Sequence, residues 1–576
     1  MDRTATTLAL LVLLSMAAGF AHAQWPDDPA TNLAIADPSG EQTQAKIRVT
    51  ADGGAYVSWF DNSTGGYDVT LQRLDASGNE LWAHNGVLIA DRGFSSTQDY
   101  DLDMDTSGNA LLTFRDDRSG GTQITATKVS PAGVQLWGAT GVQLTTGSDF
   151  VAAPKIAGTT DGQVVVAWTN NSDVRLQKLD ADGIAQWGAG VTIPAIGGDS
   201  TSASDMDASD AGGVIISMVR GFMAPKWLYA QKYNSAGNPQ WGLLPLAVFD
   251  GGALQTANFP QFVPDGNGGA AFAWYSVDAG LQCHAQWVQA DRTQAFGHNG
   301  VTVSTAAASR TQPAVSFNAA TSETFVFWRE ETGGPFPEFG VYGQKLGPAG
   351  VRLWGDGGVE VEPLSTTELV QVTQASTGSG AEVLWVETLA FAQQLVHASR
   401  LNNDGTFQWS PQTTSVSSVI SGKSRLTVAS TSDDAVLAVW SDGRNDVNDV
   451  YGQRVASDGT LGNGSVPGRV SDLMLDRSTG TPGALLLSWN QACGTAQDYG
   501  IYEGTLGSWY NHGQIDCSDD DGDLAEEILP AAGDRYLLVV PLGASDEGSY
   551  GVDSQANERP AGAATCEAAQ NLADCP

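Results

Sequence analysis

Hydrophobic and polar positions alternate along most of the chain in short runs, separated by turns rich in Gly, Asp, Asn and Ser. Between Lys46 and Ala90, four such runs follow one another: Lys46–Val49, Gly54–Phe60, Tyr67–Leu74 and Val87–Ala90. A period of two is typical of β-strands, and the intervening residue types are those that tight turns require. The pattern predicts a unit of four strands, and no long helical pattern competes with it.

This unit recurs eight times. The second run of each copy carries a large anchor residue, and successive anchors are 50 to 57 residues apart: Trp59, Phe114, Trp168, Met218, Trp274, Trp328, Trp385 and Trp440. A second aromatic follows the glycine turn in seven copies: Trp82, Trp137, Trp187, Trp241, Phe296, Trp354 and Trp409. One small sheet cannot bury both of its faces and must stack on its neighbours. The repeat therefore predicts an all-β fold, with an eight-bladed β-propeller over residues 24–463; a tandem of sandwich domains is disfavoured because the unit is too short.

The two ends of the repeat array complement each other. The eighth copy stops at Gly462 without a fourth run, and it has Leu461 in place of the second aromatic. Residues 32–37 match the missing run and precede the first complete unit. We expect this segment to pair into the last blade and close the ring, with Trp25 in the place of the missing aromatic.

A second domain follows the repeats. The periodicity breaks near Val466, and alternating segments such as Ala484–Trp489 and Arg535–Val540 come after it. They predict a β-sandwich of the fibronectin-III or immunoglobulin type over residues 466–560. Residues 561–576, rich in Ala, are expected to form a loosely ordered tail held by a cysteine clip.

The first 23 residues have the features of a secretory signal peptide. A short charged start leads into the apolar run Leu8–Leu14, and Ala21-His22-Ala23 supplies small residues at a cleavage position before Gln24. No later stretch has the roughly 18 apolar residues that span a membrane. The sequence thus predicts secretion, to the cell exterior, the periplasm or the cell surface, without membrane insertion.

Secretion permits disulfides among the five cysteines. Proximity in sequence favours Cys493 with Cys517 and Cys566 with Cys575, which leaves Cys283 as a lone buried thiol.

The chain is strongly acidic, with 65 Asp and Glu against 28 Lys and Arg and a net charge of −37. Such a field repels a phosphate backbone, so nucleic acid is excluded as a partner. Cations, cationic surfaces and neutral glycans remain open as partners, and the preferred interpretation is that the acidity only keeps an extracellular protein soluble.

The segment from Leu74 to Trp82 resembles the tryptophan-docking repeat of pyrroloquinoline-quinone-type propellers, with variants at Asp180–Trp187 and Asn234–Trp241. It is also similar to repeats of uncharacterised exported bacterial proteins. The resemblance implies eight blades, with the Trp as a structural wedge between them. Quinone enzymes of that group use an adjacent cysteine pair, whereas the repeats here contain only Cys283, so no such cofactor is expected.

Polar residues stand two positions after each anchor and are expected to form a belt on the face that carries the longer loops. They are Asp61, Asp116, Asn170, Arg220, Ser276, Glu330, Glu387 and Asp442. Asp442 is followed by Arg444, Asp446 and Asp449, the densest charged cluster on this face. The ligand-binding candidates are Asp61, Asp116, Glu330, Glu387, Asp442 and Arg444. Capping of the next turn by short polar side chains is the simpler interpretation.

An acidic run in the second domain is a candidate calcium site. Five carboxylates lie between Asp516 and Asp523, among them Asp519, Asp521 and Asp523, and calcium takes six to eight oxygen ligands. An EF-hand register fails, because placing Gly522 at loop position six puts Ile528 where a carboxylate is required. A solvated acidic loop is the preferred interpretation.

The sequence contains no G-x-S-x-G elbow, zinc-ligand spacing or phosphate loop. We therefore expect a secreted, non-enzymatic binding or adhesion scaffold, with an extracellular protein or glycan as ligand on the long-loop face. The alternative is a secreted carbohydrate-active hydrolase that uses the belt carboxylates.

Overall fold

The computed structural model describes residues 25–572, apart from positions 98, 222–224, 257, 278–279, 379, 463–467, 479, 493–495, 497, 520–523, 544–545, 553–557, 563 and 568. Within these residues the only helices are two short 3-10 turns, η1 (Ile196–Gly198) and η2 (Asp210–Gly212). No described helix is long and apolar enough to span a membrane. The predicted signal peptide lies outside the described residues.

The repeats form eight four-stranded antiparallel sheets within the described chain. Blades one to four are made of β2 (Gln42–Val49), β3 (Ala55–Asp61), β4 (Asp68–Leu74) and β5 (Val87–Ala90); β6 (Tyr100–Met104), β7 (Ala110–Asp116), β8 (Gln123–Val129) and β9 (Val142–Gln143); β10 (Val151–Gly158), β11 (Val164–Asn170), β12 (Asp173–Leu179) and β13 (Val191–Ile193); β14 (Thr201–Ala208), β15 (Val214–Arg220), β16 (Trp227–Tyr233) and β17 (Leu246–Phe249).

Blades five to eight are made of β18 (Phe262–Pro264), β19 (Ala270–Ser276), β20 (Gln282–Val288) and β21 (Val301–Thr302); β22 (Ser309–Asn318), β23 (Glu323–Glu331), β24 (Phe339–Leu346) and β25 (Val359–Ser365); β26 (Glu368–Ser376), β27 (Gly380–Ala390), β28 (Gln393–Asn402) and β29 (Thr413–Ser421); β30 (Lys423–Ser430), β31 (Val436–Asp442), β32 (Asp449–Val455) and β1 (Leu33–Ala36).

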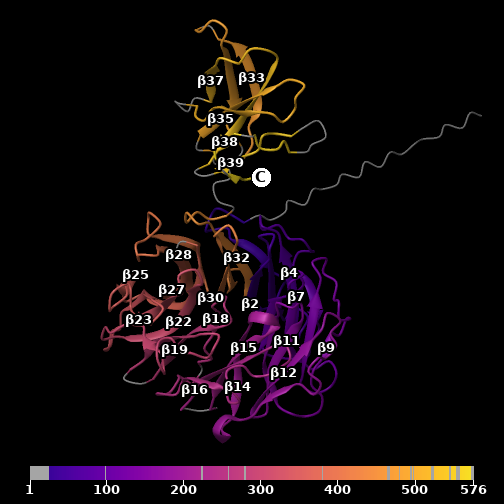
Figure 1. Ribbon diagram of the computed structural model, residues 1–576, viewed down its shortest axis with the longest axis vertical. Helices are drawn as coiled ribbons and strands as arrows, with labels where there is room; N and C mark the ends of the chain where they lie inside the picture. Colours follow the sequence, from indigo (N-terminus) through magenta and orange to yellow (C-terminus); the bar gives the residue numbers. More distant parts are fainter. Residues whose placement is uncertain are drawn as a thin grey trace, which may run out of the picture.

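The first strands of the blades form the inner circle of the ring, and β2, β18, β22 and β30 lie near its middle in Figure 1. Each of these strands contacts the first strand of the next blade, and β30 of the last blade contacts β2 of the first. The contacts therefore run through a complete circle. The prediction of an all-β, eight-bladed propeller is confirmed.

The core is divided among the interfaces between blades, and β11 shows why its sequence is almost wholly apolar. Val164, Val166 and Trp168 pack against blade two, while Val165 and Ala167 pack against blade four. Side chains of a strand alternate between its two faces, and both faces of a blade are covered by neighbours. A continuous apolar run is therefore needed in the second strand of each blade.

The second aromatic of each repeat is a wedge between blades, as the repeat resemblance implies. The indole Nε1 of Trp82 donates to the carbonyl of Pro131 in the next blade (3.1 Å), and its ring lies against Gly133. Gly133 has a φ of +79°, and an added Cβ would lie 3.3 Å from the indole. The same bond to the following blade is made by Trp137, Trp187, Trp241, Trp354 and Trp409.

The N-terminal segment closes the ring. Strand β1 pairs antiparallel with β32 and completes the eighth sheet, as predicted. Trp25, only 4% exposed, lies against Gly78 of blade one, and its backbone N–H donates to Ser77 (3.0 Å). Gly78 is the turn glycine equivalent to Gly133, so Trp25 occupies the eighth wedge position.

The C-terminal domain is a β-sandwich (Figure 1). One sheet contains β33 (Ser471–Arg477), β34 (Leu485–Asn490) and β37 (Ala525–Ile528); the other contains β36 (Gly513–Asp516), β35 (Asp498–Thr505), β38 (Arg535–Leu542), β39 (Asp546–Glu547) and β40 (Ala569–Gln570). Leu487, Trp489, Tyr499, Ile501 and Val539 form the core between the two sheets. A fibronectin-III or immunoglobulin topology stays a prediction.

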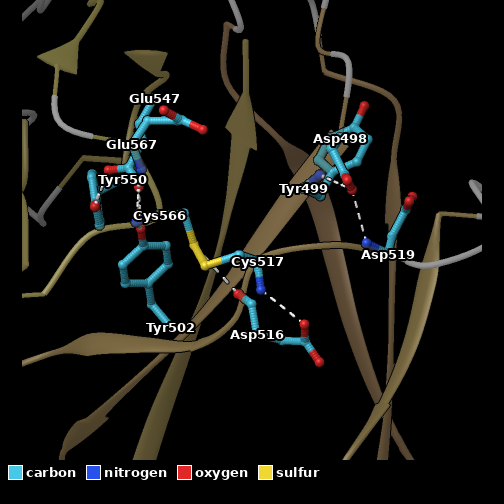
Figure 2. Close-up of a disulfide and its surroundings, with 10 residues drawn as sticks. All are labelled: Asp498, Tyr499, Tyr502, Asp516, Cys517, Asp519, Glu547, Tyr550, Cys566 and Glu567. Carbon is cyan, nitrogen blue, oxygen red and sulfur yellow. Dashed lines mark hydrogen bonds between the residues drawn. A yellow bond between two sulfur atoms is a disulfide. The ribbon is translucent and has the colours of Figure 1, made fainter. Parts of the chain in front are cut away.

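The disulfide joins Cys517 to Cys566 (Figure 2). The predicted pairs Cys493–Cys517 and Cys566–Cys575 are therefore wrong. Cys517 follows edge strand β36, and the buried carboxylate of Glu547 accepts the backbone N–H of Cys566 (2.7 Å), so the fold brings together cysteines that are 49 residues apart. Cys283 is a buried free thiol, as predicted, whereas Cys493 and Cys575 lie outside the described residues.

Candidate functional site

The belt residues end the second strands, and their side chains are held by partners in the protein. Asp442 is fully buried and accepts hydrogen bonds from Ser421 Oγ (2.6 Å), Lys423 Nζ (2.9 Å), Trp440 Nε1 (2.8 Å) and Arg444 Nη2 (2.7 Å). Burial alone raises the pKa of Asp442, but the hydrogen bond from Arg444 and the charge of Lys423 outweigh it and lower that pKa to about 2. Asp442 is thus an ionised anchor for the last blade.

Glu330 repeats this arrangement in blade six. Its Oε2 accepts both Trp328 Nε1 and Arg310 Nε at 2.9 Å, and the carboxylate is buried. An indole N–H and a cation thus share one carboxylate oxygen in blades six and eight.

The remaining acidic candidates also have partners within their own blades. Asp116 binds the guanidinium of Arg118, Asp61 accepts the backbone N–H of Ser63 (2.8 Å), and Glu387 contacts His397 Nε2 (2.8 Å). Among the described residues, no group of three or more His, Cys, Asp or Glu side chains is placed to hold a metal ion.

Calcium in the second domain stays a prediction. Asp519 is buried, and its backbone N–H donates to the carboxylate of Asp498 (2.9 Å), as Figure 2 shows. Asp521 and Asp523 lie outside the described residues.

A cavity of about 350 Å³, the inner pocket, lies between blades three and four on the long-loop face. Its lining comprises Asp99, Phe150, Ala152, Ala153, Thr169, Asn171, Ser200, Ser202, Gly221, Lys226, Thr256 and Phe259. Phe150 and Phe259 are 58% and 48% exposed, so part of each aromatic side chain is accessible to solvent. The pocket therefore offers solvent two aromatic faces together with hydroxyl and amide groups.

Lys226 is a buried cation in the inner pocket. It is 1% exposed, its Nζ donates to the Thr256 carbonyl (2.6 Å), and it lies 4.3 Å from the centre of the Phe259 ring. Burial lowers the pKa of Lys226. No carboxylate of a described residue forms an ion pair with it.

A second cavity of about 350 Å³, the outer pocket, lies between β9 of blade two and β12 of blade three. Its lining includes side chains that can form hydrogen bonds: Gln143, Thr145, Thr146, Asp149, Trp168, Asn170, Arg175 and Gln177. Only 7% of the surface of Trp168 is exposed. Trp168 Nε1 and Arg175 Nε are both buried atoms, and neither has a hydrogen-bond partner among the described residues.

The two pockets share a wall formed by Asp149, Phe150, Asn170 and Asn171. Phe150 N–H donates to Asn171 Oδ1 (3.0 Å), and Asn170 Nδ2 donates to Asp149 Oδ2 (3.1 Å). Hydrogen bonds from Asn171 and Asn170 lower the pKa of Asp149, so its carboxyl is ionised at neutral pH. Asp149 and Asn170 thus line the outer pocket, and the residues that follow them in the chain, Phe150 and Asn171, line the inner pocket.

A third set of charged residues lies on the inner strands of the first four blades. Lys46 Nζ lies 3.4 Å from Asp101 on β6, and Arg48 Nε lies 3.3 Å from Asp103. Asp207 on β14 has a pKa well above its usual range because of burial and the neighbouring charge of Asp205. Sequence reasoning missed this set, although the polar–apolar alternation of Asp101-Leu102-Asp103 marked it.

The pockets were also missed from sequence, and one signal for them was available. Among the eight belt positions, blade three has Asn170 where five other blades have an acid. Arg175 stands directly opposite the anchor Trp168 in the strand register. The other blades place Thr70, Thr125, Tyr229, His284, Tyr342, His397 or Tyr451 there.

These features define the chain as an eight-bladed β-propeller joined to a β-sandwich, with two neighbouring pockets on blades two to four. No protein-family model matches the sequence, and no curated protein matches it. Similar solved structures include a PL25 ulvan lyase bound to -[GlcA(1-4)Rha3S]-, 11% identical over 64% of this chain and 93% of that chain, with a TM-score of 0.40.

The BP39L lectin from Burkholderia pseudomallei is 14% identical over 64% of this chain and 98% of that chain, with a TM-score of 0.40. An α-L-arabinanase from Penicillium chrysogenum is 11% identical over 73% of this chain and 97% of that chain, with a TM-score of 0.31. Since propellers carry many functions, no residue role is transferred from these proteins.

Proposed function

We propose that the protein is an exported, non-enzymatic glycan-binding protein whose ligand occupies the inner pocket. The observation that carries the proposal is the exposed pair Phe150 and Phe259 at a cavity with a partly polar lining. A sugar ring has an apolar C–H face and a rim of hydroxyl groups. Aromatic faces and hydrogen-bonding side chains in one pocket complement both parts of that ring.

The polar lining supplies the second half of this recognition. Thr169, Ser200 and Ser202 carry hydroxyls, and Asn171 carries an amide. Each of these groups donates or accepts hydrogen bonds, as a polyol requires. A cavity of about 350 Å³ lies at the small end of the range for ligand sites, ~300–1,000 Å³, which fits one or two sugar units.

Export is supported by the Cys517–Cys566 disulfide, because such bonds persist in oxidising compartments. A binding role on the long-loop face agrees with the rule that loops on a rigid scaffold carry recognition. The sandwich then serves as an accessory domain or as a tether for the propeller.

A glycan array with the full chain tests the proposal, followed by calorimetry on the best oligosaccharide. We expect Phe150→Ala and Phe259→Ala each to weaken binding at least tenfold. Phe391→Ala is the matched control, since Phe391 is 98% exposed and is not part of the pocket lining. Unchanged affinity in both pocket variants would sink the proposal.

The alternative, a carbohydrate-active hydrolase, is favoured by one observation. Asp442 and Asp449 are directly opposed in the strand register, and their pKa values are shifted to about 2 and about 6. Pairs of carboxyl groups with divergent pKa values are typical of acid–base sites. Both side chains are buried, however, so a substrate would require local opening. Hydrolysis of a substrate panel that is abolished by Asp442→Ala would favour this alternative over the binding role.

A further inference from the structure

Blade three differs from blades six and eight in the hydrogen bonding of the indole N–H of its anchor tryptophan. In blade six, Trp328 Nε1 and Arg310 Nε both donate to Glu330 Oε2. In blade eight, Trp440 Nε1 and Arg444 Nη2 both donate to Asp442 Oδ2. In each case the carboxylate comes from the residue two positions after the tryptophan.

Blade three has the tryptophan and the cation but lacks the carboxylate. Trp168 and Arg175 are register partners on neighbouring strands, so their side chains lie on the same face. The residue two positions after Trp168 is Asn170, whose Nδ2 donates to Asp149. Among the described residues, Trp168 Nε1 and Arg175 Nε have no hydrogen-bond acceptor.

Two buried donors without acceptors are energetically costly, so a ligand that supplies an acceptor is favoured. Both residues line the outer pocket, and the residues around them leave a cavity of about 350 Å³. Within the described chain, Trp59 Nε1, Trp274 Nε1 and Arg444 Nε also have no partner. The register partners of Trp59 and Trp274, however, are Thr70 and His284 rather than a guanidinium. The combination of indole, guanidinium and cavity distinguishes blade three.

We propose that the outer pocket binds a carboxylate of its ligand, which replaces the side-chain carboxylate that blades six and eight supply themselves. Charge-assisted hydrogen bonds from a guanidinium are among the strongest available to a carboxylate. The ligand class is an acidic sugar, a uronate in particular; that the carboxylate is carried by a sugar rests on the glycan-binding function proposed above.

The shared wall gives the two pockets a common ligand. Asp149 and Asn170 line the outer pocket, whereas their chain neighbours Phe150 and Asn171 line the inner one. An oligosaccharide that crosses this wall places a ring against Phe150 in the inner pocket and a uronate in the outer pocket. Asp149 is exposed to solvent and hydrogen-bonded to Asn170, so water and salt screen its repulsion of the ligand.

Calorimetry of the full chain with glucuronate and with glucose, a pair that differs in charge but shares the ring, tests the inference. We expect glucuronate to bind at least tenfold more tightly than glucose. Arg175→Gln should remove this preference, and Arg220→Gln should not, although it removes one positive charge from the same face. The melting temperature of each variant is measured to verify folding.

A second variant fills the site from within. Exchanging the wall residues, Asp149→Asn with Asn170→Asp, places a carboxylate at the position used in blades six and eight and keeps an amide beside it. We expect this double variant to lose glucuronate binding at least tenfold and to melt at a higher temperature than Arg175→Gln.

Glucose 6-sulfate identifies the oxyanion. Binding of the sulfate ester as well as glucuronate defines a general oxyanion site, and binding of glucuronate alone defines a carboxylate site; both support the inference. Equal binding of glucuronate and glucose, or unchanged glucuronate affinity in Arg175→Gln, overturns it. Phe259→Ala should leave the binding of this monosaccharide intact, so failure of the inner-pocket proposal is recognised separately.

Discussion

At the scale of single residues, the ring pairs carboxylates with specific donors, and the pairing sets their ionisation. Asp442 and Asp449 stand opposite each other on β31 and β32, yet only Asp442 has cations beside it. Asp449 Oδ1 has no hydrogen-bond partner in the part of the chain that the structure describes. Burial together with the charge of Asp446 raises the pKa of Asp449 to about 6, although a hydrogen bond from Asn445 opposes this. Two similar residues in one strand pair therefore have opposite effects on stability at neutral pH.

Asp449→Asn should stabilise the protein above pH 6. The folded-state pKa of Asp449 is higher than its usual value of 3.8, so the folded state binds the proton more tightly and its ionisation is destabilising. This penalty is absent below about pH 3.8, grows as the pH rises through 6 and is then constant, at about 3 kcal/mol. Melting curves of wild type and variant should separate at pH 8 and coincide near pH 4.

Asp442→Asn is the control of opposite sign. The pKa of Asp442 is lowered to about 2, so its ionised form contributes stability above the usual value of 3.8, and that stability is lost as the pH falls towards 2. The variant should destabilise the protein at pH 8, by about 3–5 kcal/mol, because Lys423 and Arg444 lose their buried partner. Variants that shift in the same direction at pH 8 would contradict both assignments.

At the scale of elements, the propeller is closed by non-covalent contacts of the segment before β2. Asn32, 2% exposed, donates to the Val416 carbonyl (2.8 Å), and its Oδ1 accepts Ser417 Oγ (2.7 Å). Ser418 N–H donates to the Pro29 carbonyl (3.0 Å). The segment therefore holds β29 of blade seven and β32 of blade eight together.

Trp25→Ala should destabilise the propeller by about 3 kcal/mol, as expected for loss of a buried tryptophan. Deletion of residues 24–38 removes β1 as well, and we expect a broader, less cooperative melt at a lower temperature. Trp82→Ala is the matched comparison, because it removes an internal wedge and leaves the closing strand intact. A deletion variant that melts like the intact protein would show that the ring needs no closure.

At the scale of the whole molecule, the propeller and the sandwich have separate cores and different means of stabilisation. The propeller distributes its core over the interfaces between blades. The sandwich has a smaller core and carries the described disulfide. Glu547 adds a buried polar network by accepting hydrogen bonds from Tyr502, Tyr550 and Cys566 (Figure 2).

Replacing Cys517 and Cys566 together by Ser should lower the stability of the sandwich by about 2–4 kcal/mol, since the bond closes a long loop. The propeller contains neither cysteine, so its unfolding should not change. Differential scanning calorimetry should therefore show one transition at a lower temperature and one at the original temperature. A joint shift of both transitions would mean that the two domains unfold as one unit.

The repeat made the architecture predictable from sequence because it reflects local physics. Strand alternation, turn glycines and anchor spacing act within about 55 residues, and they were sufficient for the blades, the wedges and the closing strand. The sites were not predictable in the same way. Trp168 and Arg175 form a site only when β11 and β12 pair in this register and blades two and three enclose a cavity beside them.

The sequence by itself thus determined the all-β class, the eight blades and the burial of Cys283 as a free thiol. The reason is that periodic burial constrains each strand independently of the rest. Only the tertiary structure decided the Cys517–Cys566 pair, the partners of the belt carboxylates and the position of the two pockets. These depend on contacts between residues that are distant in sequence, where side-chain direction, register and shape act together. Sequence distance carries no information about such contacts.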